Sequence, residues 1–149
     1  MIFRQATEAD LPAIVTLLAD DPLGAGRENP AMPPDRRYVA AFAAIAADPN
    51  QLLAVAEADG AVVGTLQLTF LPGLSRLGMW RGQIEAVRIA ERARNAGAGQ
   101  AMFEWAIEAC RARGCGLVQL TTDISRPDAH RFYERLGFKA SHAGYKLAL

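Results

Sequence analysis

The sequence predicts an α+β fold, a three-layer α/β arrangement in which a mixed, mostly antiparallel sheet of six to seven strands is flanked by about four helices. Three observations predict it. Apolar and polar residues alternate in the middle of the chain, which is typical of strands. Apolar residues recur at helical spacing elsewhere. From residue 79 onward, strand-like and helix-like segments alternate, which is typical of a strand–helix–strand crossover.

In the first half of the chain, the periodicity predicts two helices between an N-terminal strand and a β-hairpin. Thr7 is placed as an N-cap, and Leu11 begins an apolar stripe. Ala58-Asp59-Gly60 is a turn signal between two strand-like segments. The predicted elements are a strand at 2–5, helices at 7–18 and 38–45 separated by a loop at 21–35, and strands at 52–57 and 61–71.

The second half predicts a crossover and a closing segment. Pro72-Gly73 ends the hairpin, and Gly137 is placed as the C-cap of the last helix. The predicted elements are a strand at 79–90, a helix at 98–113, a strand at 117–122, a helix at 126–136 and one or two closing strands at 138–149.

Composition narrows the class of protein. A chain of 149 residues that is 51% hydrophobic is globular rather than disordered. Since 16 basic residues balance 16 acidic ones, we expect no nucleic-acid partner. Without a membrane-spanning apolar run or a signal-peptide pattern, we expect no membrane partner and a cytoplasmic location. Cys110 and Cys115 are interpreted as buried small hydrophobes, and no metal-ligand spacing is present.

The run Arg94-Asn95-Ala96-Gly97-Ala98-Gly99 links a predicted strand to a predicted helix. Its small side chains let main-chain N–H groups converge on an anion at the positive end of the helix dipole. A P-loop is excluded because the required Lys is absent, and a dinucleotide fingerprint is disfavoured because Met102 stands where a small residue is needed. The remaining pattern is Arg/Gln-x-x-Gly-x-Gly/Ala, and the alternative is a plain strand-to-helix turn.

A second motif, Ala129-His130-Arg131-Phe132-Tyr133-Glu134-Arg135-Leu136-Gly137-Phe138, follows about one crossover downstream. Together with the glycine loop it resembles the GNAT superfamily of N-acetyltransferases. That family has an acetyl-CoA loop of this pattern and a late helix that often carries Ala-x-x-Phe-Tyr-x-x-x-Gly-Phe. The resemblance covers residues 1–149 as one N-acetyltransferase domain. It implies an enzyme that moves an acetyl group from acetyl-CoA to a primary amine by direct attack in a ternary complex.

By this resemblance, the glycine loop binds the pyrophosphate of CoA through its main chain, and Arg94 adds a charge or is solvated beside it. The preceding strand offers main-chain groups to the pantetheine arm, with Val87 as the oxyanion donor, although Val87 and Ile89 are also typical core residues. The family often has an Asn before the last helix, which this chain lacks, so Ser125 makes that contact or only caps the helix. The residues implied to contact acetyl-CoA are Val87, Arg88, Ile89, Arg94, Asn95, Ala96, Gly97, Ala98, Gly99, Gln100, Ser125 and Phe132.

Two residues are implied to act in catalysis. Tyr133 is the candidate general acid for the leaving thiolate, although its place on an apolar stripe also fits a core residue. Glu85 is the candidate base, acting directly or through water, because strand alternation puts it on the same side as Val87. An ion pair with Arg81 is the alternative for Glu85.

The acceptor pocket is expected from the first two helices, the loop at 21–35 and the closing strands, which do not identify the amine. A small-molecule amine is the expected partner, and the resemblance is compatible with a homodimer. The alternative function is a non-catalytic acyl-CoA binding or sensing module, which would keep the loop and tolerate the loss of Tyr133 and Glu85.

Overall fold

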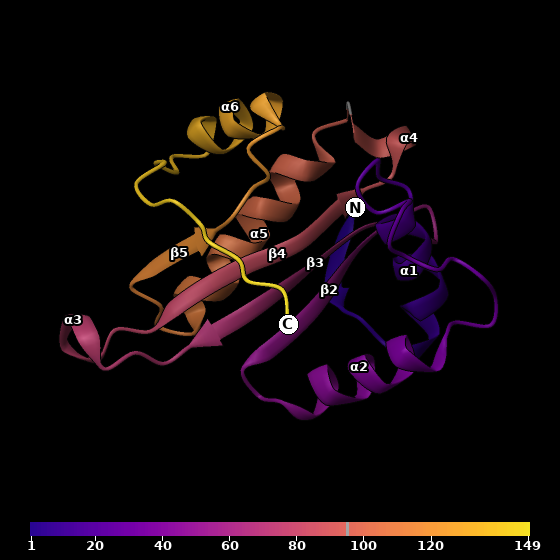
Figure 1. The fold of residues 1–149 in the computed structure, drawn as a ribbon, viewed down its shortest axis with the longest axis horizontal. Coiled ribbons are helices and arrows are strands. Elements are labelled where there is room, and N and C mark those ends of the chain that lie inside the picture. Colours follow the sequence, from indigo (N-terminus) through magenta and orange to yellow (C-terminus); the bar gives the residue numbers. More distant parts are fainter. Residues whose placement is uncertain (95) are drawn as a thin grey trace.

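The computed structural model describes residues 1–94 and 96–149, and its strands form one sheet in the order β1-β2-β3-β4-β5 (Figure 1). Strands β1 to β4 pair in an antiparallel manner, whereas β4 and β5 are parallel. The predicted meander followed by a crossover is therefore confirmed. The strands are β1 (Ile2–Gln5), β2 (Gln51–Ala58), β3 (Ala61–Leu71), β4 (Arg81–Ile89) and β5 (Leu117–Leu120).

The predicted six to seven strands are wrong, because the described residues form five. Residues 138–149, expected to supply the closing strands, contain neither helix nor strand. The run from Ala140 to Gly144 is small and polar, and Tyr145 and Leu147 are 94% and 86% exposed. The alternation of apolar residues in this segment therefore covers no apolar surface, and a strand gains its stability from such a surface and from a paired neighbour.

Helices cover both faces of the sheet. On one face, Met102 and Phe103 of α5 pack with Leu66 and Leu68 of β3 in the larger core. On the other face, Ile14 of α1 packs in a smaller core, and α2 contributes no fully buried side chain. Among the described residues, the longer helices match the predicted four, and two short helices and a 3-10 turn are added. The helices are α1 (Leu11–Ala19), α2 (Arg36–Ala47), α3 (Ser75–Gly78), α4 (Glu91–Arg94), α5 (Ala98–Ala112) and α6 (Pro127–Arg135), and the turn is η1 (Glu8–Asp10).

A bulge in β4 changes the orientation of its last residues. Gln67 pairs with Glu85 and Thr65 pairs with Arg88, so a single β3 residue opposes both Ala86 and Val87. Ala86 has a φ of 53°, which is unusual for a residue with a Cβ. Val87 packs against the α5-side core, whereas Glu85 is exposed. The predicted alternation is therefore wrong, and Glu85 and Val87 lie on opposite faces.

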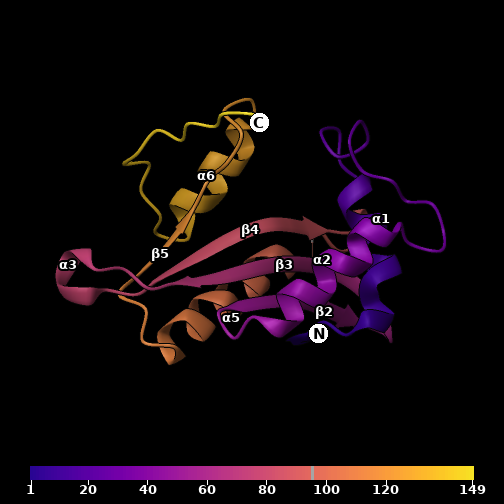
Figure 2. The ribbon, with the colours of Figure 1, turned by 60° about the horizontal axis from the view of Figure 1, so that its bottom comes forward.

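Figure 2 shows that β4 runs from the α3 end of the sheet to the α1 end, so the bulge lies near α1.

Within the described part of the chain, no helix has both the length and the apolar character needed to cross a membrane. Cys110 is fully buried, and burial raises the pKa of its thiol to about 11. Cys115 is only half-buried, so the prediction of two buried cysteines is confirmed for Cys110 alone.

Asp10 links the first strand to the first helical turn through hydrogen bonds. Its carboxylate accepts hydrogen bonds from the Thr7 N–H at 2.7 Å and from the Arg4 guanidinium at 2.7 and 2.9 Å. Arg4 also donates to Glu57 on β2 at 3.0 and 3.1 Å. The Arg4 guanidinium, more than the Thr7 bonds, holds the pKa of Asp10 well below its usual range. The ion pair thus ties β1, β2 and the start of α1 together.

We expect Asp10→Asn to lower the free energy of unfolding at pH 7 by about 2 kcal/mol, because it removes the charge of one of the two carboxylates that bind Arg4 in a partly buried site. The folded pKa of Asp10 is lowered, so its stabilisation is present above about pH 4 and is lost as the pH falls. Urea denaturation should show a difference between wild type and variant that shrinks towards pH 3. Asp59→Asn in the exposed hairpin turn is the control, and an equal difference at both pH values would contradict the prediction.

Candidate active site

The glycine loop connects β4 to α5 through the single turn of α4. Gly97 is the N-cap of α5 and has φ 75° and ψ 6°, a left-handed conformation that favours glycine. The N–H groups of Ala98, Gly99 and Gln100 begin the helix, so helix geometry gives them no carbonyl partner in their own helix. These three N–H groups are therefore available to an anion. The predicted contact of Asn95 lies outside the described residues.

Gly99 brings predicted cofactor residues from three elements together. A Cβ at this position would lie 3.8 Å from Ile89 Cγ1 on β4 and 3.8 Å from Phe132 Cζ on α6. Arg94 turns back to the same strand, where its Nε donates to the Ile89 carbonyl at 3.0 Å. Its guanidinium also lies 4.0 Å from Asp20, at a half-exposed position. The loop, the end of β4 and α6 thus meet at one place.

The end of β4 has an open edge. β5 pairs with β4 only as far as Ile84, and no described strand pairs with β4 beyond it on that side. The N–H of Ala90 donates to Val63 O at 2.8 Å and so faces β3. Because the direction of main-chain groups alternates along a strand, those of Val87 and Ile89 point the other way, to the open edge.

Two guanidinium groups confirm this orientation of the main chain. The carbonyl of Val87 accepts from Arg88 at 2.7 Å, and the carbonyl of Ile89 accepts from Arg94, as expected for carbonyls that are not bonded to β3. The N–H groups of Val87 and Ile89 face the same edge, where no strand among residues 1–94 and 96–149 pairs with them.

Tyr133 lies in an aromatic cluster beside this edge. Its ring centroid is 5.5 Å from those of Phe103 and Phe132 and 6.2 Å from that of Phe138. Burial raises the pKa of Tyr133, and the nearby charges of Arg126 and Arg88 oppose that rise only in part. The phenol therefore keeps its proton at neutral pH and can donate a hydrogen bond.

Glu85 lies on the polar face of the sheet. It accepts a hydrogen bond from Gln83 Nε2 at 3.3 Å and stands opposite Gln67. Arg81, the alternative partner suggested by the sequence, donates instead to Gln119 Oε1 at 3.3 Å. Glu85 is thus an exposed carboxylate without that ion pair.

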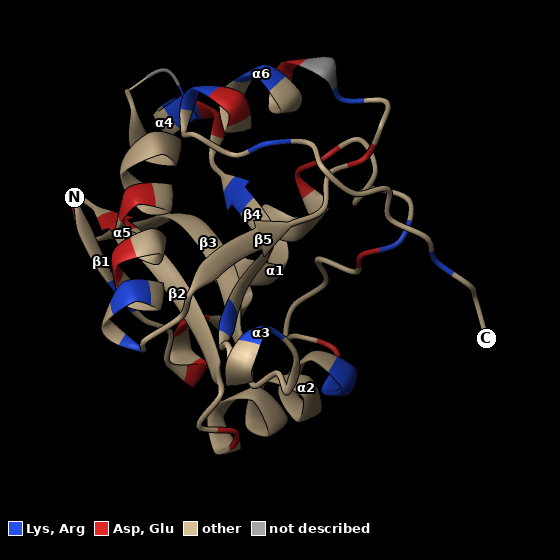
Figure 3. Cartoon of the chain, turned by 90° about the vertical axis from the view of Figure 1, so that its left-hand side faces the viewer, with Lys and Arg blue, Asp and Glu red and all other residues tan. Residues whose placement is uncertain are grey.

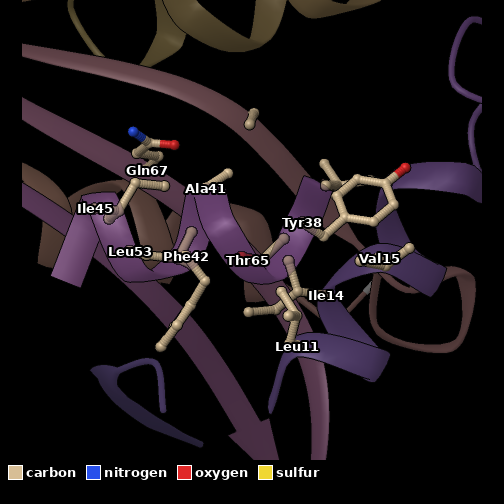
Figure 4. A pocket seen from close by; sticks show the side chains of 12 residues that line it. Leu11, Ile14, Val15, Tyr38, Ala41, Phe42, Ile45, Leu53, Thr65 and Gln67 are labelled. Atoms are coloured by element: carbon tan, nitrogen blue, oxygen red, sulfur yellow. The ribbon is translucent and has the colours of Figure 1, made fainter. Parts of the chain in front are cut away.

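An apolar pocket of about 170 Å³ lies next to Glu85, between α1, α2 and the sheet (Figure 4). Ala86 of the bulge and Gln67, the cross-strand neighbour of Glu85, both line it. The first two helices supply its walls as expected, whereas neither the loop at 21–35 nor residues 138–149, which were also expected to form the acceptor pocket, line it. The lining residues are Leu11, Ile14, Val15, Leu18, Tyr38, Ala41, Phe42, Ile45, Leu53, Thr65, Gln67 and Ala86.

Some predicted cofactor residues have their side chains engaged within the chain. The hydroxyl and N–H of Ser125 donate to Asp123 Oδ1 at 2.6 and 2.9 Å, which is the local turn geometry expected of a residue before a helix. Gln100 Nε2 donates to Glu104 at 2.8 Å. The predicted contacts of Ser125 and of the Gln100 side chain with a cofactor stay predictions.

One polar cluster beside the site was not predicted from the sequence. Asp21, just after α1, accepts two hydrogen bonds from Arg126 at 2.7 and 2.8 Å and one from Arg88 at 3.4 Å. Asp21 and Arg126 are 105 residues apart, so no spacing pattern links them. In the described part of the chain, no group of three or more His, Cys, Asp or Glu residues is arranged to hold a metal ion.

Three comparisons place this geometry among known proteins. Residues 12–138 match the model of the Acetyltransferase (GNAT) family. The aminoalkylphosphonate N-acetyltransferase of Salmonella typhimurium is 38% identical over 108 residues, which are 72% of this chain and 70% of that protein. A structure described as a transcriptional regulator from Bacillus halodurans C-125 is 51% identical with a TM-score of 0.97, over 99% of both chains. A putative acetyltransferase from Agrobacterium tumefaciens is 31% identical with a TM-score of 0.85, over 100% of both chains.

The family match covers most of the chain and includes the glycine loop, the open edge of β4 and the helix that carries Tyr133. The predicted resemblance is confirmed, and the enzyme class follows from it. The chain belongs to the acetyltransferase (GNAT) family and is an N-acetyltransferase.

Proposed function

We propose that residues 1–149 act as one N-acetyltransferase domain that uses acetyl-CoA and acetylates the primary amine of a small molecule by direct attack in a ternary complex. The observation that carries the proposal is that the start of α5 and the open edge of β4 meet at Gly99. N–H groups at the start of a helix suit a pyrophosphate, and an unpaired strand edge suits the amide groups of a pantetheine arm. Both surfaces consist of main-chain groups, and the small side chains of the loop leave these groups accessible.

The proposed chemistry divides between the two faces of β4. The amine nitrogen attacks the thioester carbon, a C–N bond forms and the C–S bond breaks. The N–H of Val87 donates to the carbonyl oxygen as that oxygen gains negative charge. Tyr133 gives its phenolic proton to the leaving sulfur, and Glu85 receives the proton of the amine through water. Holding both reactants in place supplies much of the rate, so few catalytic groups suffice.

The acceptor is proposed to enter beside the apolar pocket, because Ala86 and Gln67 connect that pocket to Glu85. The name of the Salmonella relative gives aminoalkylphosphonates as the substrates of that enzyme, which makes short amines with an acidic group the first class to assay. The test is thiol release from acetyl-CoA with a panel of amines that includes 2-aminoethylphosphonate, β-alanine and propylamine. Amine-dependent release supports the proposal, and release with no amine in a broad panel contradicts it.

The second candidate function is a non-catalytic acyl-CoA binding or sensing module. The observation in its favour is that the Bacillus halodurans relative, 51% identical to this chain, is described as a transcriptional regulator. Such a module binds acetyl-CoA tightly and releases no thiol with any amine. The same assay, combined with calorimetry of acetyl-CoA binding, separates the two functions.

A homodimer and a cytoplasmic location stay part of the proposal. The exposed Tyr145 and Leu147 of the C-terminal segment are compatible with a dimer. Light scattering coupled to size exclusion should give twice the 16.0 kDa mass of the chain, and a single-chain mass would remove the dimer from the proposal.

We expect Gly97→Glu to weaken acetyl-CoA binding at least 30-fold in calorimetry. The variant puts a carboxylate beside the proposed phosphate site and forces a side chain into φ 75°. Gly114→Glu is the matched control, because Gly114 has φ 76° and stands just beyond the other end of the same helix. Both variants should lose similar thermal stability, and only Gly97→Glu should lose affinity. Unchanged affinity in Gly97→Glu would refute the phosphate site.

Tyr133→Phe should lower kcat by about 10- to 100-fold and leave the Kd of acetyl-CoA within about twofold, because it removes only the proton donor. Burial raises the pKa of Tyr133, so its ionisation should not reduce wild-type kcat between about pH 7 and 9. Tyr145→Phe, at an exposed tyrosine, is the control and should be fully active. Full activity in Tyr133→Phe would take this phenol out of the mechanism.

A further inference from the structure

Two guanidinium groups share one carboxylate next to the proposed reaction centre. Arg126 donates to both oxygens of Asp21, and Arg88 reaches one of them at 3.4 Å. The Asp21 side chain is 10% exposed, that of Arg88 15% and that of Arg126 35%. Two guanidinium groups thus share the Asp21 carboxylate at a largely buried place that opens to solvent on the Arg126 side. The charges of Arg27 and Glu28 also act on Arg88, and they have opposite signs.

Arg88 is under-bonded for a buried cation. Its Nε is fully buried and has no hydrogen-bond partner among residues 1–94 and 96–149. One terminal nitrogen donates to the carbonyl of the adjacent Val87, and the bond to Asp21 is longer than the 2.7–2.9 Å usual for charged pairs. Burial accordingly lowers the pKa of Arg88. A buried guanidinium with free donors is stabilised by a further anion.

Asp21 has partners other than the two arginines. Its Oδ2 also accepts from the N–H groups of Leu23 and Gly24 at 3.2 and 3.1 Å. Burial raises the pKa of Asp21, but the Arg126 hydrogen bonds and the Arg88 charge outweigh burial, so the carboxylate is ionised at neutral pH. The backbone of its own loop also holds this carboxylate in place. An oxyanion of a ligand can therefore replace Asp21 as the partner of the two arginines.

The position of this cluster relates it to the acceptor. Arg88 follows Val87, the proposed oxyanion donor, and Arg126 caps the helix that carries Tyr133. Figure 3 shows a basic position at the end of β4, and the hydrogen bonds of Arg88 and Arg126 to Asp21 link this strand end to the residue that precedes α6. Tyr133 lies on α6, the helix that begins directly after Arg126.

We propose that Arg88 and Arg126 bind an oxyanion, a phosphonate or carboxylate, that the acceptor amine itself carries. This inference rests on the proposed function and adds the residues that select the acceptor. The planar forks of two arginines suit the oxygens of such a group. Because Arg88 directly follows Val87, we expect the selected acceptors to carry the acid close to the amine.

The test compares Arg126→Gln with Arg131→Gln. Arg131 lies on the same helix, 64% exposed, and pairs with Asp128, so it is a matched charge-removal control. We expect the kcat/KM ratio of 2-aminoethylphosphonate over propylamine to fall at least tenfold in Arg126→Gln and to stay unchanged in Arg131→Gln. Arg88→Lys keeps the charge but loses Nε and the fork, and it should lower the ratio at least threefold. If Arg126→Gln does not fold, the selectivity ratio of Arg88→Lys decides whether the arginines select the acceptor.

A second measurement needs no turnover. Methylphosphonate, titrated by calorimetry into the wild-type protein with CoA present, should bind, and Arg126→Gln should weaken its binding at least tenfold. The subsite would be overturned if both proteins bound methylphosphonate equally or if the selectivity ratio stayed unchanged. A variant that raised only the KM for acetyl-CoA would overturn it as well. If no amine releases thiol, the proposed function fails by itself, and the methylphosphonate titration still decides whether the arginines bind an oxyanion.

Discussion

The bulge in β4 is the constraint on which the arrangement of the site depends. One extra residue, Ala86, lets the strand keep its pairing with β3 on both sides of the irregularity. Before the bulge Glu85 faces the polar side, and after it Val87 returns to the core against α5. β5 stops pairing with β4 just before the bulge, at Ile84. The same few residues therefore supply an exposed carboxylate, a buried side chain and an open main-chain edge.

The sequence predicted the regular parts of this fold because their signals are local. The strand Ile2–Gln5 and the hairpin strand Ala61–Leu71 have the expected bounds, since alternation and turn residues define both. The bulge had no such signal, because Ala86 adopts φ 53° without being glycine and is held there by pairing on both sides. The closing strands were wrong for the opposite reason, because an alternating pattern at 145–149 is not sufficient without a surface to cover.

The candidate site likewise has parts that local motifs predicted and a part that they did not. The glycine loop and Tyr133 belong to short contiguous motifs, and the structure brings their neighbours Gly99 and Phe132 into contact. The cluster of Asp21 with Arg126 joins positions 105 residues apart through the third dimension, so only the folded chain reveals it. Strand alternation failed for Glu85 because it assumes a regular pleat. Local chemistry is thus readable from a sequence, whereas a charge cluster assembled from a loop, a strand and a helix cap is not.

The loose attachment of α2 has a consequence for substrate range. This helix forms one wall of the apolar pocket and contributes no fully buried side chain, whereas α5 contributes five. The free energy of a local opening depends on the apolar surface that is lost, so α2 separates from the sheet at a lower cost than α5 does. The pocket can thereby widen by movement of a peripheral helix, while the half of the fold that is proposed to bind acetyl-CoA stays rigid. In the proposed function, the range of acceptor sizes then depends on α2, whereas the placement of the thioester depends on α5.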